Sequence, residues 1–179
     1  MLHRKIWALS LVFVLLLAGC GMGTSTMASS CDVNVSVDEA LAAQDAGMAG
    51  MLTGNVEWTN DQMSSFLTVL LQQNTGANFP IQEIATCFEP NGKILLRIGL
   101  LSDVLLGADT IEAVGSINVA NGHIVVDLDE ASANGFTVSG PMLDGIAAQI
   151  NAALADPSMG TIINIGTDSG KIMLGMGGM

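Results

Sequence analysis

The chain of 179 residues has no tyrosine, only five lysine and arginine residues, and only two histidines. Its 17 acidic residues outnumber the basic ones, which gives a formal net charge of −12 at pH 7. A surface of this charge repels the phosphates of nucleic acids and of anionic lipids, so we expect no DNA or RNA partner. Charged residues make up only 12% of the chain and hydrophobic ones 50%, which indicates a folded rather than a disordered protein.

The residues that usually carry catalysis are also scarce. His123 is the only histidine beyond position 3, and it follows a predicted turn, where we expect a solvated surface side chain. The chain has no Gly-x-Ser-x-Gly elbow, no cysteine–histidine pairing, and no glycine loop that opens a helix as phosphate-binding loops do. We therefore predict a protein that is not an enzyme and needs no cofactor.

Metal ligands form no strong pattern either. Two cysteines without clustered histidines do not make a zinc site. Asp127, Asp129 and Glu130 lie together on or just beyond a predicted hairpin and could bind calcium loosely, because hard cations prefer several oxygen ligands. The same acids could instead keep a strand edge solvated and unpaired. We predict no metal site.

The first 20 residues have the features of a secretory signal. A basic start that includes Arg4 and Lys5 precedes an uncharged apolar run over residues 6–17, which is short for a membrane span. The run ends in Leu17-Ala18-Gly19-Cys20, which resembles the lipobox of bacterial lipoproteins, in which the cysteine receives lipid and becomes the mature N-terminus. An ordinary signal peptide with an incidental cysteine is the alternative.

The lipobox resemblance implies a location and a domain organisation. Residues 1–19 would be the signal, residues 20–35 the lipidated N-terminus and a flexible tether, and residues 36–179 a single domain. Two or three acyl chains, such as palmitate, hold a protein stably on a membrane. The protein would be extracytoplasmic, anchored through Cys20 to the cell membrane or the outer membrane. Loss of Arg4 and Lys5 would leave three basic residues against 17 acidic ones, a net charge of −14.

Cys31 and Cys87 are the two cysteines beyond the lipobox. Outside the cytoplasm such a pair is normally a disulfide. Closure of a loop of this length stabilises a fold by about 4 kcal/mol in the chain-entropy model. Alternatively, Cys87 is a small buried side chain and Cys31 lies free in the linker.

Residues 111–128 contain the clearest structural signal, a hairpin that turns at Asn121-Gly122. A two-residue turn pairs Val119 with Ile124, Ile117 with Val126 and Gly115 with Leu128. One face of this ribbon is then apolar and the other polar, so another element must cover the apolar face.

Two further hairpins are predicted. One covers residues 81–101 and turns at Pro90-Asn91-Gly92; if Asn91-Gly92 is a two-residue turn, Phe88 faces away from the apolar side. The other joins short runs at residues 161–165 and 171–174. In the first hairpin, the two-residue turn would place six side chains on one apolar face, namely Ala85, Cys87, Ile94, Leu96, Ile98 and Leu100.

Three segments predict helices. Ser36 and Glu39 have capping-box spacing before a helix-prone run over residues 40–46, although Gly47 and Gly50 weaken its continuation. A second capping box precedes a helix over residues 60–73. A proline at a first helical position precedes a third helix over residues 142–154. In the second helix an apolar stripe faces a core, while four polar side chains are expected to face solvent, namely Ser64, Ser65, Thr68 and Gln72.

These elements predict an α+β fold: a curved antiparallel β-meander of about six strands with two or three helices packed on one face. The apolar surfaces could close into a filled core or leave a groove between helices and sheet. Eleven methionines fit either outcome, because methionine fills irregular cores and also suits adaptable apolar surfaces. The side chains that would line such a groove are Met63, Phe66, Leu67, Leu70, Ile117, Val119, Ile124, Val126, Ile146 and Ile150.

The order of elements resembles that of the LmeA-like and YpmS-like families of bacterial envelope proteins. The resemblance rests on the run from Trp58 to Leu67, the two Asn-Gly hairpins, the Gly140-Pro141-Met142-Leu143 helix start and the last hairpin. It spans about residues 57–174 and contains no catalytic motif. It implies half of a tubular lipid-binding (TULIP-type) module, with a helix lying in a curved sheet and a lipid as ligand.

Two functions follow as hypotheses. The first is a non-catalytic, membrane-anchored lipoprotein that binds a lipid or another apolar ligand in a groove between helices and sheet. The second is a structural or interaction lipoprotein of an envelope assembly, with a filled core and no ligand. Besides the membrane, reached through the lipid anchor, the sequence identifies no protein partner.

Overall fold

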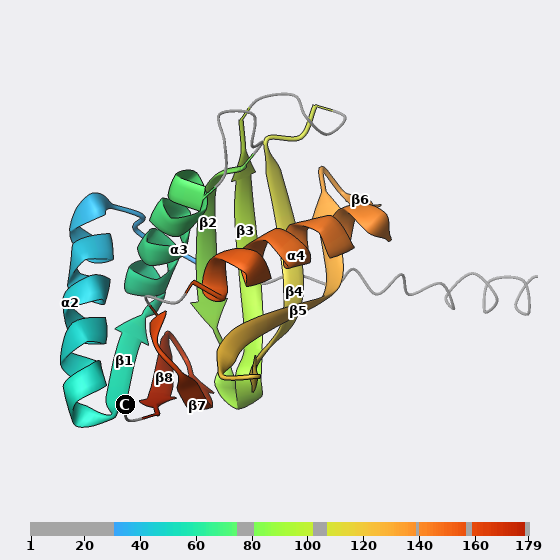
Figure 1. The fold of residues 1–179 in the computed structure, drawn as a ribbon. Helices are drawn as coiled ribbons and strands as arrows, with labels where there is room; N and C mark the ends of the chain where they lie inside the picture. The colour runs from blue at the N-terminus through green and yellow to red at the C-terminus, as the bar shows by residue number, and fades with distance from the viewer. Residues whose placement is uncertain (1–30, 75–80, 102–106, 139, 157–158, 178–179) are drawn as a thin grey trace, which may run out of the picture.

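The computed structural model describes residues 31–74, 81–101, 107–138, 140–156 and 159–177. The predicted signal, Cys20 and most of the tether lie outside these residues. They contain three α-helices and eight strands, and the strands form two antiparallel sheets, which confirms the α+β class (Figure 1). The elements in order are α2 (Val37–Thr53), β1 (Asn55–Thr59), α3 (Asn60–Asn74), β2 (Ile81–Phe88), the 3-10 turn η2 (Pro90–Gly92), β3 (Lys93–Leu100), β4 (Thr110–Ala120), β5 (His123–Ala133), β6 (Phe136–Val138), α4 (Pro141–Leu154), β7 (Ile162–Asp168) and β8 (Lys171–Met176).

The larger sheet has five strands in the order β2-β3-β4-β5-β6, and a smaller sheet has the order β1-β8-β7. The sequence predicted about six strands in one meander, so β1 and β6 and the division into two sheets are additions. Both added strands are short, with five and three residues, and β1 lies directly between two helices. β6 is too short to show a period of two, whereas β1 alternates strictly between exposed polar and buried apolar residues, a signal that the sequence prediction did not use.

The β4–β5 hairpin has the predicted register. Val119 pairs with Ile124, Ile117 with Val126, and Gly115 with Leu128. Asn121 and Gly122 have positive φ angles of 53° and 80°, as a two-residue hairpin turn of this type requires. The apolar face that the register creates is buried, with the exception of the half-buried Val119.

The β2–β3 hairpin differs from the prediction by one residue. Pro90 joins Asn91 and Gly92 in a three-residue turn, so Phe88 pairs with Ile94 and Cys87 pairs with Leu95. A shift of one residue moves every side chain of a strand to the other face. Phe88 therefore belongs to the core face of β2, whereas Ala85 and Cys87, which were predicted there, lie on the opposite face.

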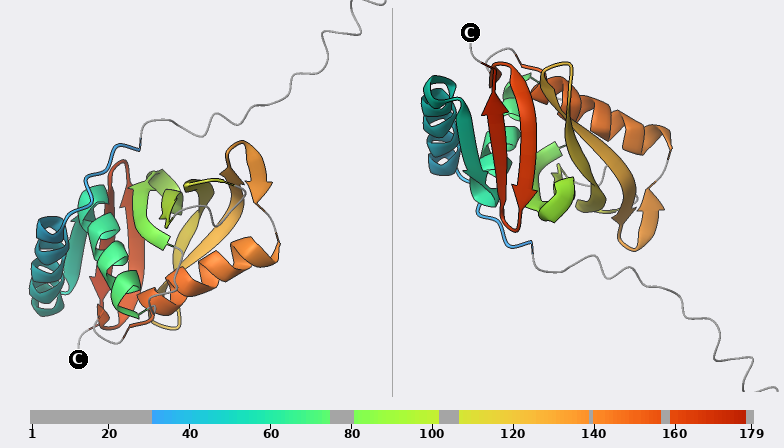
Figure 2. Two further views of the ribbon diagram at one scale, coloured as in Figure 1. Left: turned by 90° about the horizontal axis from the view of Figure 1, so that it is seen from above. Right: turned by 90° about the horizontal axis from the view of Figure 1, so that it is seen from below.

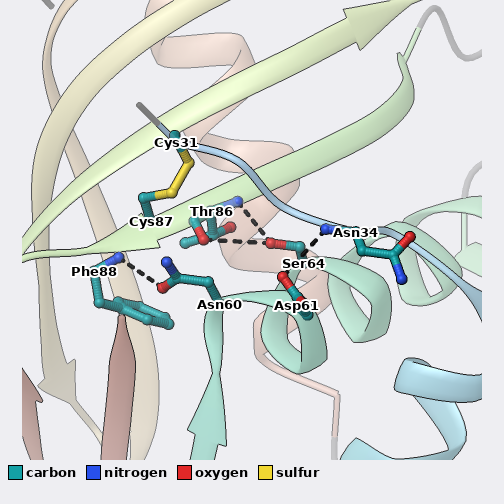
Figure 3. Close-up of a disulfide and its surroundings, with 8 residues drawn as sticks. All are labelled: Cys31, Asn34, Asn60, Asp61, Ser64, Thr86, Cys87 and Phe88. Carbon is teal, nitrogen blue, oxygen red and sulfur yellow. Dashed lines mark hydrogen bonds between the residues drawn. A yellow bond between two sulfur atoms is a disulfide. The ribbon is translucent and has the colours of Figure 1, made fainter. Parts of the chain in front are cut away.

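Because this register places Cys87 on the outer face of β2, Cys87 can form a disulfide with Cys31 there (Figure 3). The disulfide fixes the start of the described chain to the outer face of β2. From there the segment crosses to α3, where the Asn34 N–H donates to Asp61 Oδ1 and the Ser36 N–H donates to Ser65 Oγ. The chain then enters α2.

Helix α3 begins with the predicted capping box. The Gln62 N–H donates to Thr59 Oγ1, and the Thr59 N–H donates to Gln62 Oε1. The prediction that its polar stripe faces solvent is wrong for most of the stripe. Ser64, Ser65 and Thr68 are buried, and only Gln72 is exposed.

Ser64 and Thr68 are buried because this side of α3 lies along the free edge of β2 (Figure 3), whereas Ser65 is covered by the segment before α2. Ser64 Oγ accepts from the Thr86 N–H at 2.7 Å and donates to the Thr86 carbonyl at 3.3 Å. Thr68 Oγ1 bonds both backbone groups of Ile84 in the same way, at 3.0 and 3.3 Å. At the two ends of the row, Asn60 Oδ1 accepts from the Phe88 N–H and Gln72 Nε2 donates to the Gln82 carbonyl.

The geometry of the two elements explains this row. Four helix residues rise about 6.0 Å, while two strand residues rise about 6.6 Å. Side chains four apart on α3 therefore meet backbone groups two apart on β2. The helix takes the place of a sixth strand and leaves β2 with no bare edge for another chain to pair with.

The opposite side of the sheet is closed in the same manner. Asn151 of α4 accepts from the Val126 N–H at 2.8 Å and donates to the Val126 carbonyl at 2.9 Å. Val126 lies on the stretch of β5 that β6 does not cover, since β6 pairs only with Ala131, Ser132 and Ala133. Helices α3 and α4 thus cap one edge each, and their apolar sides cover the inner face of the sheet.

Candidate functional site

The ten residues predicted to line a groove lie together in the hydrophobic core. Eight of them are buried, and Val119 and Ile146 are partly buried against the same cluster. Met63, Ile150 and their neighbours pack between α3, α4 and the five-stranded sheet. Of the ten, only Phe66 also lines the pocket described next.

An apolar pocket of about 210 Å³ lies between α2 and the three-stranded sheet. Figure 2 shows α2 at one end of the molecule, beside β1 and away from α4. The pocket is therefore separate from the predicted groove. It is lined by Gln44, Gly47, Met48 and Met51 of α2, Val56 and Trp58 of β1, Phe66 of α3, Met159, Ile162 of β7, and Leu174 and Met176 of β8.

Helix α2 forms one wall of the pocket, and two glycines set how closely it approaches β1. A Cβ at Gly50 would collide with the Val56 side chain and lie 2.8 Å from the Asn55 carbonyl oxygen. A Cβ at Gly47 would lie 3.4 Å from the indole of Trp58. The two glycines that weaken helix propensity in the sequence are therefore the residues that let α2 pack on this strand, and the helix continues to Thr53.

The Trp58 indole forms the inner wall. Its Nε1–H donates to the carbonyl of Ala43 at 2.9 Å, inside the structure, so its polar atom is already satisfied. Its ring lies 5.2 Å from the ring of Phe66, centroid to centroid, in a tilted arrangement. The sequence contains only one other tryptophan, at position 7, so Trp58 is a natural reporter of this pocket.

Four methionines from three parts of the chain give the pocket its character. Met159 and Met176 are almost fully buried, whereas Met48 and Met51 are about half exposed at the rim. Methionine side chains are flexible and polarizable, and they are common at apolar surfaces that accept varied ligands. A wall of this kind can adjust to its occupant more readily than one of valine or isoleucine.

The lining of the pocket is almost entirely apolar. No charged side chain occurs among the described residues that line it, and Gln44 at the rim is the only amide. Its volume exceeds the roughly 150 Å³ of an engineered apolar cavity that binds benzene, and falls below the roughly 300 Å³ at which drug-sized sites begin. It suits a small apolar molecule or part of an acyl chain rather than a whole phospholipid.

The remaining predicted sites are distributed elsewhere. His123 is half-buried rather than fully solvated, and its Nδ1 has no hydrogen-bond partner among the described residues. Asp127, Asp129 and Glu130 are exposed on β5, and the described residues contain no group of three or more His, Cys, Asp or Glu side chains that could hold a metal. None of the helices in the described part of the chain is both long and apolar enough to cross a membrane.

Sequence reasoning missed most of this pocket for a physical reason. Met48 and Met51 lie one helical turn apart, which places them on one face of α2. They line the pocket together with Met159 and Met176, which lie more than 100 positions away in the sequence, and no local period predicts that such distant residues share a pocket. The available signals were the spacing of Met48 and Met51 beside two glycines and the alternation that places Val56 and Trp58 on one face of β1.

Comparison of the chain with protein-family models, with curated proteins and with solved structures gives no significant match.

Proposed function

We propose that this protein is a membrane-anchored, extracytoplasmic lipoprotein that binds an apolar ligand, such as part of a lipid acyl chain, without catalysis. The binding site in this proposal is the methionine-lined pocket between α2 and the three-stranded sheet. It replaces the groove predicted from the sequence, whose residues pack in the core.

The observation that carries the proposal is the open, uncharged pocket of about 210 Å³ with half-exposed methionines at its rim. Exposed methionines are not needed to fill a core, and burying each one against a ligand would remove apolar surface from water at about 25 cal/mol per Å². The lipobox resemblance adds the anchor, and the LmeA-like resemblance agrees with a lipid as ligand.

Ligand binding can be tested with the full chain carrying Cys20→Ser, which blocks lipidation at the lipobox, and Trp7→Phe, which leaves Trp58 as the only tryptophan. Lipids that co-purify are identified by native mass spectrometry, and decanoic acid and Nile red are titrated while Trp58 fluorescence is recorded. We expect saturable binding and a change in Trp58 emission, because the indole lines the pocket. Absence of co-purified lipid together with absence of saturable binding of both probes would refute the proposal.

A matched pair of variants localises the binding. Gln44→Phe places an apolar ring at the rim of the pocket, whereas Ala49→Phe places the same ring on an exposed position of α2 that does not line it. We expect the first variant to weaken decanoic acid binding at least tenfold and the second to leave it unchanged. Equal effects of the two variants would show that decanoic acid binds outside this pocket.

The anchor is tested separately. Cys20→Ser should release the protein from the membrane fraction of cells that express the full chain, because no acyl chain could then be attached. Release is read by fractionation and by the loss of the mass of the lipid group. Retention of the lipid group's mass after this change would contradict the lipoprotein part of the proposal and leave the pocket unaffected.

A second candidate function is a structural or interaction lipoprotein without a ligand. It is favoured by one observation, the close packing of the predicted groove residues in the core. The probes above separate the two functions, since this candidate requires that Trp58 emission stay unchanged by decanoic acid.

A further inference from the structure

Helix α2 turns its small residues toward the domain and its large apolar residues toward solvent. Its buried face consists of small residues, with Ala40, Ala43 and Gly50 against the rest of the domain. The large apolar side chains point outward. We call these five residues the α2 stripe; their exposed fractions are Val37 69%, Leu41 53%, Met48 58%, Met51 42% and Leu52 91%.

This arrangement is unusual for a surface helix. An amphipathic helix normally turns its large apolar residues toward the core and its polar residues toward water. Contiguous exposed apolar patches of this kind mark sites of interaction. The small residues of α2 are explained by its close approach to β1, but in the described part of the chain the side chains of the α2 stripe stay largely exposed.

The spacing along α2 is that of a helix that packs on another helix. Residues 37, 41, 44, 48 and 51 follow one another at intervals of 4, 3, 4 and 3, which is the seam of a heptad repeat. All are apolar except Gln44, near the middle. A single polar residue in such a seam sets the register of the partner helix at some cost in stability.

The charges beside this seam are all negative. Asp38 and Asp45 are exposed, lie seven residues apart and occupy the same flanking position of the heptad. Residues 37–53 include no lysine or arginine. Charges at this position determine which partner a helix accepts, so α2 selects for lysine or arginine on the flank of the partner.

We infer that the α2 stripe is a docking site for an amphipathic helix of another protein, with an apolar seam and lysine or arginine on its flank. This function goes beyond ligand binding in the pocket. A bilayer surface fits less well, because helices that lie in membrane interfaces carry basic residues and aromatics, and α2 has neither. A second copy of this chain in antiparallel contact would bring Asp38 and Asp45 against the same acids.

The probes are two synthetic 21-residue peptides that share leucines at the seam positions. One carries lysine at the flanking positions and the other carries glutamate. Their binding to the full chain with Cys20→Ser is measured by fluorescence anisotropy at about 150 mM salt. We expect the lysine peptide to bind at least tenfold more tightly than the glutamate peptide, and Asp38→Lys combined with Asp45→Lys to reverse this preference.

Attraction of a basic peptide to an acidic protein must be distinguished from docking on the stripe. Leu41→Ser removes apolar surface from the stripe without changing charge, and should weaken the lysine peptide at least tenfold. Phe136→Ser is the matched control, since Phe136 is 67% exposed on β6 at the other end of the molecule. It should leave the affinity unchanged.

Each remaining outcome contradicts the inference. Equal affinity of the two peptides, or equal effects of Leu41→Ser and Phe136→Ser, would show that the peptide does not dock on the stripe. Binding to phosphatidylcholine vesicles that depends on Leu41 would show that the stripe binds a membrane surface. Dimerisation in sedimentation that depends on Leu41 would show that the stripe binds a second copy of the chain. Leu41 does not line the pocket, so Leu41→Ser should preserve the Trp58 response to decanoic acid. Failure of the docking inference is thereby separable from failure of the proposed ligand binding.

Discussion

The hydroxyl of Thr68 provides a direct test of how α3 closes the edge of β2. Thr68→Val keeps the shape and branching of the side chain and removes only the oxygen. The backbone N–H and carbonyl of Ile84, which bond this oxygen at 3.0 and 3.3 Å, then lose their partner while they stay buried. Thr86→Val is a matched change on β2 itself, since the Thr86 hydroxyl is buried and unbonded among the described residues.

The expected magnitudes have opposite signs. A buried backbone group without a partner costs about 1–2 kcal/mol, and Thr68→Val leaves two. Replacing a hydroxyl by a methyl group in an apolar site regains about 1 kcal/mol. Thr68→Val should therefore lower the free energy of unfolding by about 2 kcal/mol, whereas Thr86→Val, which only removes an unpaired hydroxyl, should raise it by about 1 kcal/mol.

Urea unfolding of both variants at constant m-value measures these differences. For a domain of this size the same changes move the melting temperature by about 6 °C downward and about 3 °C upward. Amide hydrogen exchange adds a local readout, because the Ile84 N–H should exchange faster in Thr68→Val. A loss below about 0.5 kcal/mol for Thr68→Val, or equal signs for the two variants, would refute the edge-closing role.

Two further predictions concern other contacts. Gly50→Ala should destabilise the fold by at least about 2 kcal/mol because its methyl group meets Val56. Gly145→Ala, which has open space around it on α4, should stabilise the fold by about 0.5–1 kcal/mol. Chemical denaturation of both variants measures these changes, and equal signs would contradict the reasoning. Cys87→Ser opens a loop closed over 56 residues, and should cost about 4 kcal/mol in the same assay, while an unchanged midpoint would contradict a structural role of the disulfide.

The two central hairpins show what turn chemistry can and cannot predict. The turn at Asn121-Gly122 has two residues, so the register of β4 and β5 followed from the sequence as far as the pair Gly115–Leu128, and beyond it a bulge shifts the pairing by one residue. In the other turn Pro90 adopts a turn position, Asn91 has φ 67°, and the loop grows by one residue. Both readings were compatible with the letters Pro-Asn-Gly, and tertiary packing of Phe88 selects between them.

The helices show a different limit. The apolar stripe of α3 was predictable from its period, but the surroundings of its polar stripe were not. A period reports which residues share a face and says nothing of a strand edge that arrives from elsewhere in the chain. The glycines of α2 show the same limit. Gly50 lowers the helix propensity locally, and the reason it is needed, the close approach of Val56, lies outside the helix.

The pocket and the α2 stripe share Met48 and Met51, and this overlap constrains both proposals together. A side chain that contacts a ligand on one side and a partner helix on the other couples the two binding equilibria. Linkage then requires that the ligand change the affinity for the partner by the same factor as the partner changes the affinity for the ligand. If the affinity for the lysine peptide rises in saturating decanoic acid, the filled pocket orders the two methionines for docking. If the affinity falls, the partner helix inserts a side chain of its own into the pocket.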